Sequence, residues 1–171
     1  MYRAFRNLAL VALVAGGIPL LMRSYRLHFN WTASAPIGFY RKDEAPLSRG
    51  RYALVALPAS AAQLALIRHY GLRSDAHTLM PVLKQIAAMP GDSVMLSAEG
   101  VRVNGSLRPD SRPLAIDSKG RILAHWPFGL YSVASGQVWL VSSSSRSFDS
   151  RYFGPIPVSQ IKSTVHPVLT R

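Results

Sequence analysis

The chain has 171 residues, 49% of them hydrophobic, which is enough to bury one substantial core. It contains no cysteine, which excludes disulfides, thiol nucleophiles, thiolate zinc sites and iron–sulfur clusters. The formal net charge of +12 is typical either of a nucleic-acid-binding protein or of a protein that lies on anionic lipid. The basic residues are scattered without a long run of like charge, which weakens the nucleic-acid interpretation.

Residues 1–26 are basic near both ends and apolar between. Leu8 to Met22 carry no charge, and two arginines flank this stretch on each side. A helix of this length spans about 22 Å, short of the ~30 Å hydrocarbon core, but snorkelling arginines and flanking aromatic residues supply the remaining length. We predict a retained membrane anchor over residues 1–26. Because positive charge flanks both ends, charge alone does not set its orientation.

Two other interpretations of this segment remain. A cleavable signal would place its cut at Ala33-Ser34-Ala35, but that site is far from the apolar stretch and Pro36 follows it. A buried soluble helix is disfavoured by Gly16, Gly17 and Pro19.

Strand-like runs follow, bounded by Gly, Pro and Asn. Strands are expected over Arg51–Leu57, Leu79–Ala88, Ser93–Leu96, Gly136–Val141 and Ile161–Leu169, the last interrupted by Pro167. The Asn104-Gly105 pair predicts a hairpin over residues 101–107, so Asn104 is interpreted as a turn residue although it also matches a glycosylation sequon, as does Asn30.

One helix is expected outside the anchor, over Ser60–Tyr70. Ser60 and Gln63 have the spacing of a capping box, and Gly71 offers a stop. The predicted fold is therefore mostly β with one inserted helix, in a domain that covers residues 27–171.

Several chemistries have little support. The five histidines are dispersed without metal-binding spacing, and the eight acidic residues are equally scattered. Neither a G-x-S-x-G elbow nor a Walker-type glycine loop is present. We therefore predict no metal and no cofactor.

Two phrases carry more information. NWTASAPIGFY spans residues 30–40, where Pro36 restricts the backbone after Ser34, so that a hydroxyl and a backbone N–H can face one carbonyl. LKQIAAMPGD spans residues 83–92 and places Lys84 inside an otherwise apolar strand, a setting in which lysine is rare. Alone, each has an ordinary interpretation, as a polar linker and as an outward-facing lysine. The PGD triplet is interpreted as the turn that ends the strand.

Together the phrases resemble the signal peptidase family of Ser/Lys peptidases, and specifically its conjugative-transfer, TraF-like branch. A third block, SFDSRYFGP over residues 147–155, strengthens the resemblance, which extends from Asn30 to roughly Ile161. The run from Ser142 to Ser145 departs from the family pattern, so nothing is carried over to these four positions. The resemblance implies that Ser34 is the nucleophile and Lys84 its general base.

That assignment makes a physical demand on the lysine. With an unperturbed pKa near 10.4, about one lysine in 2,500 is neutral at pH 7. Lowering the pKa by roughly three units means destabilising the ammonium by about 4 kcal/mol. Desolvation beside Val82, Leu83 and Ile86 would supply this.

The resemblance also implies supporting residues. The Ser34 backbone N–H and the Thr32 hydroxyl are expected to face the oxyanion, and Ser147 to orient the lysine. Asp149 and Arg151 are expected to form an ion pair that braces the site. The ordinary interpretation of Ser147 is a serine in a turn, and that of Asp149 and Arg151 is a solvated surface pair.

The expected function is a membrane-anchored serine endopeptidase that removes signal or pro-segments from exported precursors, including pilin or conjugative-transfer subunits. We expect it in the bacterial inner membrane with its catalytic domain on the periplasmic side. Its partners would be the precursor and membrane lipid, without nucleic acid. The inserted helix and small domain favour a dedicated peptidase over a housekeeping one, and transfer to water or to an amine stays open.

Two other functions remain. An inactive, basic, membrane-tethered module that binds nucleic acid or anionic lipid would use the net charge instead of Ser34. A self-cleaving repressor is disfavoured because a DNA-binding domain is missing and the amino terminus is apolar.

Overall fold

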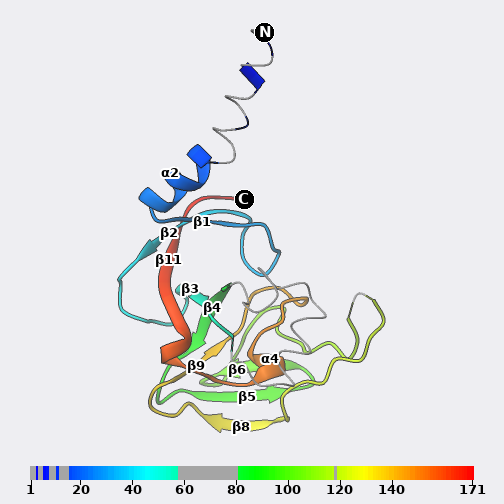
Figure 1. Ribbon diagram of the computed structural model, residues 1–171. Coiled ribbons are helices and arrows are strands. Elements are labelled where there is room, and N and C mark those ends of the chain that lie inside the picture. The colour runs from blue at the N-terminus through cyan, green and yellow to red at the C-terminus, as the bar shows by residue number, and fades with distance from the viewer. Residues whose placement is uncertain (1–2, 4–5, 8–10, 12–15, 58–80, 118) are drawn as a thin grey trace.

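The computed structural model describes residues 3, 6–7, 11, 16–57, 81–117 and 119–171 (Figure 1). Within these ranges the protein is mostly β, as predicted, and is built from two antiparallel sheets. The larger sheet has seven strands, in the order β1 (Leu27–Asn30), β2 (Gly38–Asp43), β11 (Ile161–Thr170), β3 (Tyr52–Val55), β4 (Val82–Ala88), β9 (Gln137–Leu140) and β10 (Ile156–Pro157). The smaller has four, in the order β7 (Ser106–Leu107), β6 (Gly100–Val103), β5 (Ser93–Ser97) and β8 (Gly129–Ser132).

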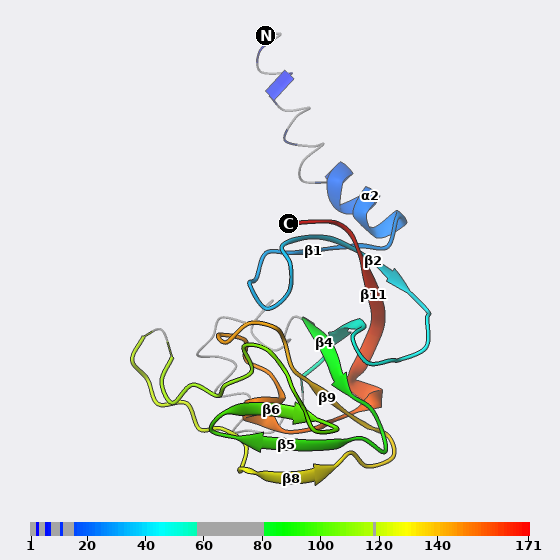
Figure 2. The same ribbon diagram turned by 180° about the vertical axis from the view of Figure 1, so that it is seen from behind.

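Helices are short in the described part of the chain. They include α2 (Ile18–Ser24), α4 (Ser150–Phe153) and the 3-10 turn Val158–Gln160, and residues 3, 6–7, 11 and 16–17 are helical as well. Both ribbon views show α2 and the end of β11 beside β1 and β2, while the smaller sheet lies at the opposite end of the molecule (Figures 1 and 2). The predicted helix Ser60–Tyr70 lies outside the described residues.

The predicted anchor is described only in part, because residues 8–10 and 12–15 fall outside the described ranges. Among the residues that are described, no helix has both the length and the apolar character needed to cross a membrane.

The five expected strands are present as β3, β4, β5, β9 and β11, with ends that shift by one or two residues where both can be compared. Pro167 does not interrupt the last of them. β11 continues to Thr170 and absorbs the proline through a register shift between Pro167 and Leu169 opposite β2.

The predicted hairpin is confirmed. Asn104 and Gly105 both have positive φ, 48° and 84°, as a type I′ turn requires, and they join β6 to β7. The Asn104 side chain also accepts from the Ser93 backbone N–H and donates to Asp92, so the turn is tied to the start of β5.

β4 is the central strand of the core. Its residues contribute to three clusters of buried side chains, with Val82 and Ile86 in the first, Ala87 and Ala88 in the second, and Leu83 in the third. Successive residues of a strand point to opposite faces, so a strand buried on both faces is apolar throughout. Lys84 and the half-buried Gln85 are the polar residues of this strand, and Lys84 is buried on the face that it shares with Val82 and Ile86.

Gly38 begins β2 at a point where the chain leaves no space for a side chain. Its φ is +146°, and an added Cβ would overlap the backbone of Leu169 and Thr170 in β11. Gly136 has a φ of +74° but open space around it. Both glycines have a positive φ, but only Gly38 lacks space for a side chain. A comparison of the two therefore separates the cost of steric overlap from the cost of backbone strain.

We expect Gly38→Ala to lower the free energy of unfolding by more than 2 kcal/mol, because the β2–β11 pairing must move. Gly136→Ala should cost about 1 kcal/mol, which is the strain of the positive φ alone. Urea unfolding of both variants measures the difference. Equal losses would show that β11 does not pack tightly on Gly38.

Candidate active site

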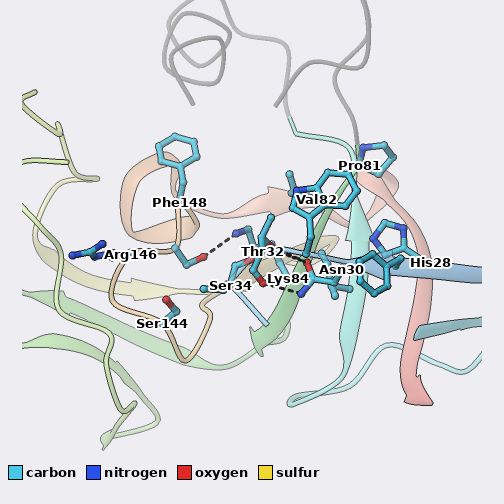
Figure 3. A pocket seen from close by; sticks show the side chains of 15 residues that line it. His28, Asn30, Thr32, Ser34, Pro81, Val82, Lys84, Ser144, Arg146 and Phe148 are labelled. Carbon is cyan, nitrogen blue, oxygen red and sulfur yellow. Dashed lines mark hydrogen bonds between the residues drawn. The ribbon is translucent and has the colours of Figure 1, made fainter. Parts of the chain in front are cut away.

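Ser34 and Lys84 lie in the wall of one cavity of about 310 Å³ (Figure 3). Three segments form this cavity: β1 with the turn after it, the start of β4, and the turn before α4. The lining residues are His28, Phe29, Asn30, Trp31, Thr32, Ala33, Ser34, Pro81, Val82, Leu83, Lys84, Ser144, Arg146, Ser147 and Phe148. Most of this wall is apolar, and none of these residues is acidic.

Ser34 is half-buried in the turn between β1 and β2. Its Oγ lies 2.8 Å from the Oγ1 of Thr32, and the Thr32 hydroxyl donates to the Asn30 Oδ1, also at 2.8 Å. The other side of the turn is held by the Tyr40 hydroxyl, which donates to the Pro36 carbonyl oxygen at 2.7 Å. The nucleophile candidate therefore lies on a turn that side chains hold in place.

Lys84 is 5% exposed, so its amino group is removed from water. Its Nζ donates to the Ser147 Oγ at 2.8 Å. Ala53 faces it on the neighbouring strand β3 and is fully buried, which leaves room for the lysine without bringing water to it.

Burial lowers the pKa of Lys84 to about 8, and desolvation is the largest cause. The Asp149 carboxylate raises this pKa and the Arg151 guanidinium lowers it. The two charges oppose each other, so the apolar surroundings determine the direction of the shift. At pH 7 about one molecule in ten would then carry the neutral amine that a general base requires.

Asp149 and Arg151 form an ion pair at 2.8 Å, and neither side chain is exposed to solvent. The pair is thus buried instead of solvated. Asp149 also caps α4 by accepting from the Arg151 backbone N–H, and it accepts from the backbone N–H of Ser142. The sequence did not predict α4, which has only four residues and depends on this cap.

The Arg151 guanidinium holds the turn that carries Ser147. It donates to the carbonyl oxygens of Ser144 at 2.8 Å and Ser147 at 2.9 Å. It also donates to those of Asp110 and Arg112, which belong to a loop far away in the sequence. Ser147 therefore meets Lys84 because a buried arginine fixes its backbone.

The structure brings all six predicted site residues into one region, in two groups. Thr32 and Ser34 are joined by a hydrogen bond on the first wall, and Lys84 is joined to Ser147 on the second, with Asp149 and Arg151 behind it. Among the described residues, no hydrogen bond joins Ser34 to Lys84. Both side chains nevertheless belong to the wall of the same cavity (Figure 3).

Four polar residues of the cavity wall were not predicted as parts of the site: His28, Asn30, Ser144 and Arg146. Asn30 is buried and bonded to the Ser34 turn, which also makes its sequon an improbable glycan site. His28 lies in the wall, and burial, with a smaller effect of Lys42, lowers its pKa. The sequence offered one signal for Asn30, because it is a polar residue at the end of an edge strand and directly precedes the S-x-P phrase.

Comparison with known proteins identifies the family. Residues 12–169 match the family described as signal peptidase, peptidase S26. The chain belongs to this family. It is 35% identical to the plasmid transfer protein TraF of Escherichia coli over 99% of both chains. It is 36% identical to the conjugal transfer protein TraF of Agrobacterium fabrum (strain C58 / ATCC 33970), over 96% of this chain and 94% of that one.

These matches confirm the resemblance found in the sequence. Among solved structures, a signal peptidase I from Enterococcus faecalis V583 is 18% identical and has a TM-score of 0.41, covering 75% of this chain and 100% of that one.

The buried ion pair yields a stability prediction. Arg151→Met leaves Asp149 buried without its counter-charge and several carbonyl groups without a donor, so it should cost about 3–5 kcal/mol. Arg26→Met breaks an ion pair with Glu44 in which both side chains are more than half exposed, at 54% and 84%, and should cost less than about 1 kcal/mol. Urea unfolding compares the two. Similar losses would contradict a bracing role for Arg151.

Proposed function

We propose that this protein is a membrane-anchored serine endopeptidase that uses Ser34 as nucleophile and Lys84 as general base. The observation that carries the proposal is the buried amine of Lys84, which shares an apolar-walled cavity with the Ser34 hydroxyl. An enzyme needs such a lysine to be neutral near neutral pH, and burial is the physical means of making it so.

The first step is acylation. The neutral Lys84 Nζ takes the proton of the Ser34 hydroxyl as Ser34 Oγ bonds to the carbonyl carbon of the scissile peptide. Negative charge develops on the carbonyl oxygen, where the Ser34 backbone N–H and the Thr32 hydroxyl would donate. The Lys84 ammonium then gives its proton to the departing amine, leaving an ester on Ser34.

The second step releases the acyl group. Water, or the amine of another peptide, attacks the ester and passes a proton to Lys84, and Ser34 regains its hydroxyl. The Ser147 Oγ accepts one N–H of Lys84, which orients the neutral amine so that its single lone pair can face Ser34.

The substrates we propose are exported precursor proteins, including pilin or conjugative-transfer subunits, cut at the outer face of the bacterial inner membrane. The names of the TraF relatives support the link to conjugative transfer. The apolar amino-terminal stretch supports a membrane anchor, and membrane lipid is then the second partner.

A second cavity of about 210 Å³ adjoins the first and shares Arg146, Ser147 and Phe148 with it. It offers space for substrate residues on the far side of the turn that carries Ser147. An extended peptide would then contact both cavities while its carbonyl lies at Ser34.

The cut itself is tested by mass spectrometry of an exported precursor incubated with the full chain in detergent. We expect one defined cut with the wild type, and a loss of at least about 10³-fold in kcat with Ser34→Ala and with Lys84→Met. The control Lys162→Met, on the exposed face of β11, should retain full activity. Cleavage that persists in either active-site variant would contradict the Ser/Lys assignment.

The pH dependence tests the base. Since neutral Lys84 is the active form, kcat/KM should rise about tenfold per pH unit below a midpoint near 8 and level off above it. His28→Gln should leave that midpoint in place, although His28 lines the same cavity. If the acidic limb of kcat/KM shifts in His28→Gln, or if kcat/KM still rises at pH 10, Lys84 is not the base.

Removing the buried amine should also change stability. The folded pKa of Lys84 lies below its unfolded value, so this group costs stability below about pH 8, and the cost disappears as the pH rises toward 10.4. Lys84→Met removes the cost but leaves the Ser147 hydroxyl without its donor. We expect the variant to be about 1–2 kcal/mol more stable at pH 7 in urea unfolding, with the gain shrinking by pH 10. A less stable variant at pH 7 would contradict the desolvation argument.

A further inference from the structure

Asn30 is the last residue of β1 and is 4% exposed, directly beside the turn that carries Ser34. Its Nδ2 donates to the carbonyl oxygens of Thr32 at 2.9 Å, Ala35 at 3.1 Å and Pro36 at 3.1 Å. Three carbonyl acceptors around one end of the amide identify that end as the nitrogen. The other end, Oδ1, must therefore be the acceptor that faces Thr32.

The Asn30 Oδ1 accepts twice from Thr32, from the hydroxyl at 2.8 Å and from the backbone N–H at 3.2 Å. A hydroxyl has a single proton, and the Thr32 hydroxyl donates it to the Asn30 Oδ1. The 2.8 Å contact between Thr32 Oγ1 and Ser34 Oγ then has only one possible direction, in which Ser34 donates and Thr32 accepts.

The hydrogen bonds thus run in one direction, from Ser34 to Thr32 to Asn30. In the free protein the proton of Ser34 points at Thr32, and the proton of Thr32 points at Asn30, so neither is directed at Lys84 or at a substrate carbonyl. Catalysis needs both protons redirected, since Ser34 must donate to Lys84 and Thr32 to the oxyanion. The amide of Asn30 is what orients this chain.

We propose that Asn30 is a positioning residue, which fixes the place of the Thr32 hydroxyl oxygen and, through Thr32, the place of the Ser34 Oγ. Its amide bonds to Thr32 and to the carbonyl groups of the turn, and no hydrogen bond among the described residues joins it to Ser34 Oγ or to Lys84 Nζ. The inference rests on the proposed peptidase function, because its effect is measured in the rate of that reaction.

The test is a double-mutant cycle in the precursor assay, with kcat and KM measured on the full chain. Asn30→Ala should lower kcat about 10- to 100-fold with KM within about twofold, because a misplaced catalytic group slows the chemical step. The same substitution should cost as much in a Thr32→Ser background, which keeps the hydroxyl. In a Thr32→Val background it should cost less than about threefold, because the link through which Asn30 acts is already gone.

The matched control is Asn104→Ala, which also removes a hydrogen-bonded side-chain amide. The Asn104 amide makes two hydrogen bonds and lies at the β6–β7 turn. The substitution should lower the free energy of unfolding and leave kcat within about twofold. Urea unfolding of each variant ensures that kcat refers to folded protein.

Equal fold-losses for Asn30→Ala in all three backgrounds would overturn the proposal, because Asn30 would then only hold the backbone of the turn. An unchanged kcat would overturn it as well. A wild type that cleaves no precursor would instead overturn the peptidase function, and with it this inference. The control variant and the wild type therefore distinguish the two failures.

Discussion

An amine buried in an apolar core is costly to charge, and much of this structure is arranged around that cost. Water hydrates an exposed lysine and keeps it protonated at neutral pH, whereas the surroundings of Lys84 offer one neutral hydroxyl as acceptor and little else. The carboxylate of Asp149 would stabilise the ammonium, but Arg151 lies against it and opposes its effect on the lysine. Desolvation therefore lowers the pKa of Lys84, because the opposite charges of the neighbouring ion pair offset each other at the lysine.

The fold explains how a strand can contain such a group. β4 contributes to three core clusters, and all of its side chains except that of Gln85 are buried. Ser34 reaches that cavity from an edge strand, β1, and Ser147 from the turn before α4. Rigid support for both turns comes from buried polar side chains, Asn30 for the first and Arg151 for the second.

Much of this could be predicted from the sequence. Apolar periodicity located the five strands, and the Asn-Gly pair located the hairpin, since a type I′ turn needs two residues of positive φ. The PGD triplet after β4 does form a turn, with Gly91 at a φ of +88°. Lys84 stood out because a lysine is rare within an apolar strand.

Other features depend on contacts between distant residues and so leave little trace in a local pattern. Lys84 and Ser147 are 63 residues apart, and only the folded chain shows that their side chains meet. Pro167 was expected to interrupt the last strand, but a register shift carries β11 past it. Asn30 resembled a glycosylation site or a linker residue, because an amide reveals its role only through the groups around it.

The central claim is that burial makes Lys84 a base, and it can be measured without any substrate. The chain has four lysines, Lys42, Lys84, Lys119 and Lys162, so a protein labelled with isotopes at the lysine side chains gives few NMR signals to titrate. We predict that the one signal absent from Lys84→Met titrates near pH 8. A Lys84 signal that titrates at the unperturbed value near 10.4 would contradict the account.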